Sequence, residues 1–246
     1  MSHSLRRSAV IVAVAAVTAI VTLAGCAGTQ NDFLRELLNP GIDFSSVPTA
    51  PLDDHSKADG VKEALRIGIG RTVDTSSKTD GYLKNESIRI PVPERLDCAD
   101  AAPTTACSRC QVDRFEISMN RAAEWAAAEA GDVFFNALQD MTIAGAADMV
   151  TGCEAKATEY FRAENSDAVM DEFRPIITEK MTEIGLYSLY EGLNERCAAP
   201  PLDLNEYVSR RALDGLFTVL AGEEIRIRQD PDARTTALLE RVFGSK

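Results

Sequence analysis

A segment near the carboxyl end, ALDGLFTVLAG at residues 212–222, is apolar on nearly every side when drawn as a helix. A helix of that kind is buried in a globular protein, so other elements must surround it. Most of the remaining chain repeats its apolar residues at helical spacing. The sequence therefore predicts an all-α fold, a single multi-helix bundle with a buried central helix in its C-terminal part.

Capping residues and helix breakers place the other helices. Ser56 and Asp59 resemble a capping box, which predicts a helix from Ser56 to about Ser76. Pro175 is expected to kink its helix or to begin a new one at its first turn. Further helices are expected over 113–130, 132–141, 143–150, 154–164, 167–184 and 186–195, from the capping pair Asp203 and Glu206 to about 228, and from Asp230-Pro231 to about 243.

Two segments between these helices are not helical by pattern. SIRIPVP, residues 87–93, is too short and too rich in proline, and is expected to be extended, as a lone strand or half of a small hairpin. CADAAPTTACSRC, residues 98–110, is expected to be a loop. The bundle is therefore expected to carry one short extended crossing.

The N-terminal segment has the order of a secretory signal. A basic stretch, MSHSLRRS, precedes an apolar core at 9–23, which is shorter than the roughly 20 residues that cross a bilayer as a helix. Leu23-Ala24-Gly25-Cys26 then resembles the bacterial lipobox, in which the thiol receives diacylglycerol and the chain is cut just before it. An uncleaved membrane anchor is the alternative.

Lipidation at Cys26 would define both the domain limits and the location. Acyl chains such as palmitate would hold the chain at a membrane, and Ala27 after the cysteine, by the same resemblance, favours the outer membrane over the inner one. We expect the periplasmic face of the outer membrane, with the lipid on Cys26 as the membrane contact. The expected parts are a lipoprotein signal peptide at 1–25, a lipidated tether at 26–55 and a helical domain at 56–246.

The charge and the histidines exclude several classes of function. The formal net charge is -12, and surfaces of that sign repel phosphate backbones, so we expect no nucleic-acid partner. The two histidines, His3 and His55, fall outside the expected helical domain. Imidazole is the commonest general base near neutral pH and a common metal ligand. We therefore expect no cofactor, no metal site and no enzymatic activity.

Five blocks of the sequence resemble a known family: IRIPVP (88–93), FEISMNRAAE (115–124), EFRPII (172–177), ALDGLF (212–217) and IRQDPDARTTALLERVFG (227–244). In order, they resemble the bacterial domain-of-unknown-function family 4197, exported helical proteins. The resemblance spans about residues 59–244 and implies a single all-α domain in the cell envelope, but no activity. Cys98, Cys107 and Cys110 stand where the family is associated with a cysteine-free connector, so these thiols are an addition to its pattern.

Five cysteines follow the lipobox. Cys107-Ser-Arg-Cys110 is a C-x-x-C, so a redox role is one interpretation, and a zinc site built from three or four of the thiolates is another. An oxidising periplasm favours structural disulfides over both. Because five is an odd number, at least one of these thiols has no disulfide partner among them, and the disulfide connectivity cannot be deduced from the sequence. The disulfide candidates are Cys98, Cys107, Cys110, Cys153 and Cys197.

Glu116, Asn120 and Glu124 recur every four residues, so they form one stripe along the helix expected at 113–130, with Arg121 beside it. Two carboxylates could do acid–base work, or bind a cation together with the amide. The favoured interpretation is structural: Glu116 pairs with an arginine of a neighbouring helix, and Glu124 is solvated.

Asp214 stands inside the apolar run at 212–222. Burying it alone would be costly, so we expect an arginine partner, either Arg210 or Arg211 one turn earlier or an arginine from another block. It is either a ligand-binding or catalytic carboxylate or, as favoured, one member of a buried ion-pair network. The candidate set for that network or ligand site is Arg89, Glu116, Asn120, Arg121, Arg174, Asp214 and Arg234.

Two further features have a functional and a structural interpretation. Arg228, Arg234 and Thr235 could cradle an anion at a helix N-terminus, but side chains in such positions more often bond the preceding carbonyls. Trp125 is the only tryptophan, and it either fills a seam between helices or marks a partner surface.

Together these observations favour a lipid-anchored periplasmic domain that acts by binding, as a scaffold or interaction partner of an unknown envelope protein. The alternative is a small-molecule or lipid-binding bundle, with a pocket lined by apolar residues and by Glu116, Asn120, Asp214 and an arginine. A carboxylate-based hydrolase that uses Glu116 with Asp214 or Glu124 is less favoured.

Overall fold

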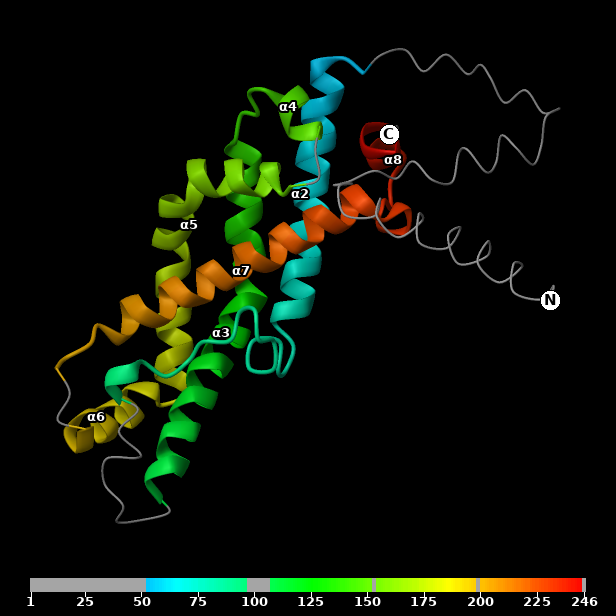
Figure 1. The fold of residues 1–246 in the computed structure, drawn as a ribbon. Coiled ribbons are helices and arrows are strands. Elements are labelled where there is room, and N and C mark those ends of the chain that lie inside the picture. The colour runs from blue at the N-terminus through cyan, green and yellow to red at the C-terminus, as the bar shows by residue number, and fades with distance from the viewer. Residues whose placement is uncertain (1–51, 97–106, 152–153, 198–199, 245–246) are drawn as a thin grey trace, which may run out of the picture. The chain divides into compact units, whose positions relative to one another are not determined.

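The computed structural model describes residues 52–96, 107–151, 154–197 and 200–244. Within these ranges it contains seven α-helices, two short 3-10 turns and no β-strand, so the all-α prediction is confirmed (Figure 1). The predicted signal peptide, Cys26 and most of the tether lie outside the described residues. The elements are α2 (Asp54–Ser76), η1 (Glu94–Leu96), α3 (Cys107–Asp140), α4 (Ala146–Val150), α5 (Lys156–Glu183), α6 (Leu186–Cys197), α7 (Leu204–Gln229), η2 (Pro231–Ala233) and α8 (Ala237–Phe243).

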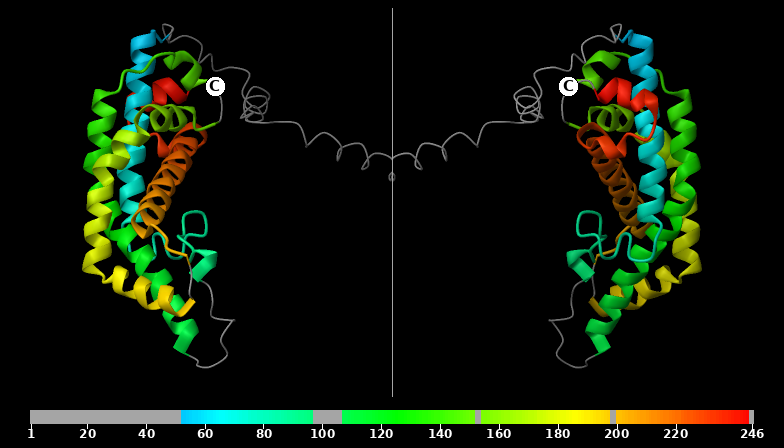
Figure 2. Two further views of the ribbon diagram at one scale, coloured as in Figure 1. Left: turned by 90° about the vertical axis from the view of Figure 1, so that its left-hand side faces the viewer. Right: turned by 90° about the vertical axis from the view of Figure 1, so that its right-hand side faces the viewer.

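Three long helices form one layer, and a fourth crosses it. α3 lies between α2 and α5, and α7 runs diagonally over one face of this layer (Figures 1 and 2). Short side chains on α3 allow its neighbours to approach closely. In the described part of the chain, no helix combines the length and the apolar character needed to cross a membrane. The fully buried alanines of α3 are Ala122, Ala123, Ala126, Ala127 and Ala130.

α7 has a buried face and an exposed face. Leu213, Leu216 and Leu220 are buried, whereas Thr218 is exposed and the Asp214 side chain is 45% exposed. The predicted burial of 212–222 therefore holds on the side that faces the layer and not all round. The reason is that α7 lies across the layer rather than inside it.

Three phenylalanines join α3, α5 and α7 at the crossing. The ring of Phe217 lies 5.1 Å from that of Phe134 and 6.0 Å from that of Phe161, centroid to centroid, in tilted arrangements. Such aromatic pairs contribute about 0.5–1.5 kcal/mol beyond their buried area. The aromatic cluster therefore holds the diagonal helix in register on the two helices below it.

Two predicted helix breaks, at Gly131 and between residues 164 and 167, do not occur, because buried faces continue across them. α3 runs through Gly131, where Ala130 and Phe134 on either side are both buried. α5 runs through Pro175, which lies on the exposed side of the helix, while Phe173 is fully buried. No new helix begins at Pro175, and the C-x-x-C predicted to lie in a loop occupies the first turn of α3.

Helix starts follow the capping side chains. Asp53 accepts a hydrogen bond from the Ser56 N–H at 2.9 Å, so α2 begins two residues before the predicted start. Asp203 caps α7 as predicted. Asp230 opens only the short turn η2, and α8 begins after Thr236, whose hydroxyl caps it. The final helix is therefore shorter than predicted.

Candidate functional site

Residues 77–96, between α2 and α3, form a segment that we call the strap. It is made of turns and irregular backbone and ends in η1. The prediction of a lone strand or hairpin at 87–93 is wrong: the Ile88 and Arg89 N–H groups turn back to the Asn85 carbonyl. No second strand lies beside the strap within the described residues, so other groups must satisfy its backbone.

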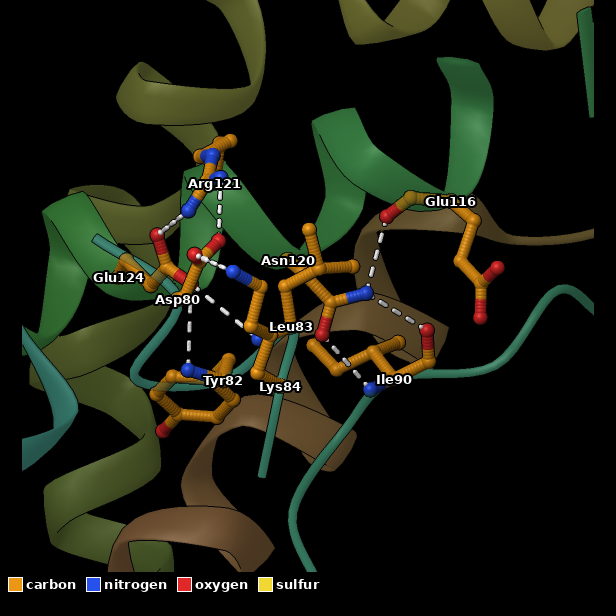
Figure 3. Close-up of polar contacts among 9 residues, drawn as sticks. All are labelled: Asp80, Tyr82, Leu83, Lys84, Ile90, Glu116, Asn120, Arg121 and Glu124. Atoms are coloured by element: carbon orange, nitrogen blue, oxygen red, sulfur yellow. Dashed lines mark hydrogen bonds and ion pairs between the residues drawn. The ribbon is translucent and has the colours of Figure 1, made fainter. Parts of the chain in front are cut away.

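Asn120 of α3 takes the place of a neighbouring strand (Figure 3). Its Oδ1 accepts from the Ile90 N–H at 2.9 Å, and its Nδ2 donates to the Ile90 carbonyl at 2.9 Å. Nδ2 also donates to the carbonyl of Glu116 at 2.9 Å. Asn120 is fully buried, and both donors and the acceptor of its amide are used. Its role is therefore to hold the strap.

Glu124 holds the strap one turn further along α3. Its Oε1 accepts from the N–H groups of Tyr82 and Leu83, each at 3.2 Å, and its Oε2 accepts from Arg121 at 2.5 Å. Arg121 also donates to Asp80 at 2.6 Å. The prediction that Glu124 is solvated is wrong, since its side chain is 1% exposed. A buried carboxylate persists there because a guanidinium and two N–H groups compensate its charge.

Asp80 anchors the beginning of the strap. It lies in the left-handed region with φ of 71°, and its carboxylate bonds Lys84 at 2.7 Å as well as Arg121. Hydrogen bonds from Lys84 and Arg121 hold the pKa of the Asp80 carboxyl below its ordinary value. The hydrogen bond to Glu124, followed by that to Asp80, raises the pKa of Arg121. These groups therefore stay charged over the whole neutral range.

Glu116 pairs with Arg89 of the strap rather than with a neighbouring helix. The guanidinium binds both carboxylate oxygens, each at 2.8 Å. This two-pronged contact raises the pKa of Arg89 and fixes the geometry of the pair. The predicted stripe of Glu116, Asn120 and Glu124 thus faces the strap along its length.

The opposite side of the strap contacts α7. Tyr82 is fully buried, and its hydroxyl donates to the Ala212 carbonyl at 2.7 Å. Burial, and then the charge of Glu124, raise the pKa of Tyr82 well above its ordinary value. A Cβ at Gly215 would lie 2.8 Å from Cε1 of Tyr82, so only glycine allows this approach. The strap therefore ties α3 to α7.

The chemistry of the stripe follows from these contacts. Arg89 compensates Glu116, Arg121 and two backbone N–H groups compensate Glu124, and the amide of Asn120 is fully bonded. Acid–base work by either carboxylate would require it to leave the strap. The arrangement is therefore suited to holding the strap between two helices.

Asp214 lies elsewhere, and the expectation that it is buried is wrong. Its side chain is 45% exposed and pairs with Arg162 of α5. Arg162 is not among the arginines that the sequence suggested as partners. Arg162 also lies over the Phe217 ring, 5.3 Å from its centroid. The apolar neighbours of Asp214 in the sequence fall on the other side of α7, which explains the wrong prediction.

A cleft opens beside Asp214, between α5 and α7. It has a volume of about 450 Å³, and it is lined by Arg174 and Asp214 among the predicted residues and not by Glu116. Arg174 spans the two helices by donating to Glu206 at 2.5 Å. A hydrolase that uses Glu116 with Asp214 is therefore disfavoured, because the two carboxylates do not line one cleft.

Arg234 contacts neither the strap nor the cleft. Its guanidinium donates to the carbonyls of Ile227 and Arg228 at 3.0 and 2.9 Å, at the end of α7, and lies 3.6 Å from Glu240. It bonds the carbonyls that a helix leaves without partners at its C-terminus. The seven candidate residues therefore occupy three places instead of one network.

Sequence reasoning missed the most buried ion pair in the described part of the chain. Glu224 and Arg228 of α7 are each 1% exposed and lie 2.5 Å apart. Glu224 accepts from the N–H groups of Ala157 and Thr158 at 3.0 and 2.6 Å, and so caps α5, which lacks a side-chain cap of its own. Arg228 also donates to the Met149 carbonyl at 2.6 Å. The i, i+4 spacing of Glu224 and Arg228 is visible in the sequence, but the backbone N–H and carbonyl groups that they bond cannot be recognised there.

The cysteine predictions fall mostly beyond what the structure describes. Cys98 and Cys153 lie outside the described residues, as does the side chain of Cys107. The Sγ of Cys197 lies 3.5 Å from the Leu96 carbonyl oxygen, at the end of the strap. The disulfides stay a prediction. Among the described residues, no three His, Cys, Asp or Glu side chains lie so that they could hold a metal ion.

Comparison with known proteins gives one match. A family model described as "Protein of unknown function (DUF4197)" matches residues 51–244, which include the strap, the cleft and every helix from α2 to α8. No curated protein matches the chain, and no solved structure matches it.

Proposed function

We propose that this chain, which belongs to the family of proteins of unknown function DUF4197, is a lipid-anchored periplasmic domain that acts by binding an envelope partner rather than by catalysis. The observation that carries the proposal is the engagement of the polar stripe. Glu116, Asn120 and Glu124 bond an arginine or the strap backbone. Side chains engaged in this way hold the strap in place and are not available to activate a substrate.

The proposed location rests on the sequence. The lipobox-like Leu23-Ala24-Gly25-Cys26 follows a basic stretch and an apolar core, which supports export and lipidation. Cys26 would then be the membrane contact, and Ala27 favours the outer membrane. The predicted tether at 26–55, of which Asp54 and His55 belong to α2, would connect the lipid to the helices.

The exposed face of α3 supports a partner surface. Trp125 and Ile117, the large apolar side chains with the greatest exposure in the described residues, are 45% and 42% exposed. They lie about two turns apart on one helix. Trp125 therefore does not fill a seam between helices, and its interpretation as a contact for another protein is the favoured one.

In-cell photo-crosslinking tests the proposal. A photoreactive residue at Trp125 is expected to give a discrete adduct with an envelope protein, and the same residue at the exposed Glu172 of α5 is not. Cys26→Ser is expected to remove both the adduct and membrane fractionation, whereas Glu116→Gln and Asp214→Asn are expected to keep them. Identical adducts from the two positions, or unchanged fractionation of Cys26→Ser, would contradict the proposal.

A second candidate function is the binding of a small molecule. The observation that favours it is the cleft of about 450 Å³ between α5 and α7, which falls within the range of roughly 300–1,000 Å³ typical of small-ligand sites.

A further inference from the structure

The cleft between α5 and α7 is held open by an ion pair at each end. Arg162 of α5 pairs with Asp214 of α7 at one end, and Arg174 of α5 pairs with Glu206 of α7 at the other. The two arginines are twelve residues apart on α5, which is about 18 Å of helix. Two such bridges fix the spacing of the helices and leave a gap between them.

The floor of the gap is apolar. Leu213 and Phe217 of α7 line it and are 4% and 2% exposed, and the partly buried Met170 of α5 lines it as well. Phe217 belongs to the aromatic cluster that joins three helices, so this floor is part of the packed core. A ligand that reaches it can bury an apolar group without moving the fold.

The middle of the α5 wall is negative, between Arg162 at one end and Arg174 at the other. Asp167 and Asp171 line it, one turn apart and exposed. Neither carboxylate has a hydrogen bond or an ion pair with any other residue that the structure describes. Two uncompensated carboxylates on one wall favour a positively charged group between them.

One end of the cleft is positive, where the α5 wall contributes Arg174 and the α7 wall contributes Arg210. Arg174 and Arg210 bind the two oxygens of the same carboxylate, that of Glu206. Their hydrogen bonds, that of Arg174 first, hold the pKa of Glu206 below its ordinary value. One negative charge between two guanidiniums leaves one positive charge over, and each guanidinium keeps N–H donors for a further acceptor.

We propose that the cleft binds a small zwitterion with an apolar middle, with its ammonium group at Asp167 and Asp171, its carboxylate at Arg174 and Arg210, and its apolar group on the floor. Asp167 and Asp171 are seven and three residues from Arg174, about 10 and 5 Å along the helix, so the two charged groups of the ligand lie about 5–10 Å apart. An extended peptide of three residues spans at most about 10 Å. The ligand class is therefore a short peptide with both ends free.

Calorimetric titration of the full chain in detergent tests this with the tripeptide Ala-Leu-Ala. The free tripeptide is expected to bind, and acetylation of its amino end or amidation of its carboxyl end is expected to weaken binding by about tenfold or more. Glycerophosphoethanolamine, which carries the two charges without the apolar middle, is expected to bind more weakly. If it binds more tightly, the ligand is a lipid headgroup and the peptide assignment fails.

Variants assign each end of the ligand. The double variant Asp167→Asn/Asp171→Asn is expected to weaken binding of the free tripeptide by about tenfold and to leave binding of the acetylated tripeptide unchanged. Arg210→Gln is expected to weaken binding of the free tripeptide to the same extent and to leave binding of the amidated tripeptide unchanged. Glu172→Gln and Arg211→Gln are matched controls that do not line the cleft. Equal binding of free and blocked peptides, or no binding at about 10 mM, overturns the proposal. Comparison of free and blocked peptides on the wild-type chain tests the proposal even if a variant fails to fold. This test does not depend on lipidation or on an envelope partner.

Discussion

The side-chain amide of Asn120 pairs with both backbone groups of Ile90, accepting from its N–H and donating to its carbonyl, each at 2.9 Å. A single buried side chain thus gives the strap the two hydrogen bonds that a strand neighbour would give. The family resemblance includes both partners, in the blocks at 88–93 and 115–124. The strap is therefore bonded to the helices as a part of the fold.

Removing this amide should destabilise the protein. Asn120→Ala leaves the Ile90 N–H and carbonyl without partners, and each buried group that loses its partner costs about 1–3 kcal/mol. We expect the free energy of unfolding in urea to fall by about 2–4 kcal/mol. Asn136→Ala, at an exposed position of the same helix, should change it by less than about 0.5 kcal/mol. An Asn120→Ala protein as stable as this control would show that the strap is not held by the amide.

Breaking the Glu224–Arg228 pair should cost more. Arg228→Met leaves a buried carboxylate with two N–H groups and the Thr158 hydroxyl but no positive charge, and the loss of one member of a buried pair typically costs about 3–5 kcal/mol. Thermal unfolding of Arg228→Met, compared with Arg226→Gln at a 56% exposed position, measures the difference. The double change Glu224→Gln/Arg228→Met should cost less than the sum of the single changes. Additive losses would mean that the two side chains do not act as a pair.

A methyl group at Gly215 should disturb the contact of α7 with the strap. Gly215→Ala places a Cβ 2.8 Å from Cε1 of Tyr82, and overpacking of this kind costs about 1–3 kcal/mol. Gly222→Ala in the same helix meets nothing within 4 Å and should stabilise the helix by about 0.5–1 kcal/mol. Urea unfolding of the two variants should therefore shift in opposite directions, and a shift in the same direction would contradict the close approach.

Stability at high pH should depend on Tyr82. Its folded-state pKa is raised above the ordinary value of 10.0, first by burial. The stability it contributes is therefore fully present below about pH 10 and is lost as the pH rises further. Urea unfolding from about pH 8 to about pH 11 should show that the advantage of the wild type over Tyr82→Phe shrinks at the alkaline end. An advantage that stays constant or grows would mean that the phenol is not buried.

Sequence patterns predicted the helices better than their ends. Apolar spacing identified the helical segments, but the breaks expected at Gly131 and between residues 164 and 167 do not occur, since Phe134 and Val169 continue the buried faces. The position of α7 across the layer is a tertiary feature. For that reason the apolar neighbours of Asp214 gave a false expectation of burial.

The stripe on α3 was visible in the sequence, but its partners were not. Glu124 and Asn120 bond backbone N–H groups of the strap, and a backbone group has the same chemistry at almost every residue. The same holds for Glu224, which caps α5 from another helix. The positions of polar residues could therefore be predicted, whereas their roles required the fold.

The central claim is that a lipid on Cys26 holds this binding domain at a membrane. Intact-mass and N-terminal peptide mass spectrometry of the chain purified from bacterial membranes tests it most directly. We expect a mature chain that begins at Cys26 and carries diacylglycerol and a further acyl chain on that residue, with Cys26→Ser retaining the preceding segment unprocessed. A chain whose Cys26 is unmodified, or that still begins at Met1 in the wild type, would contradict it.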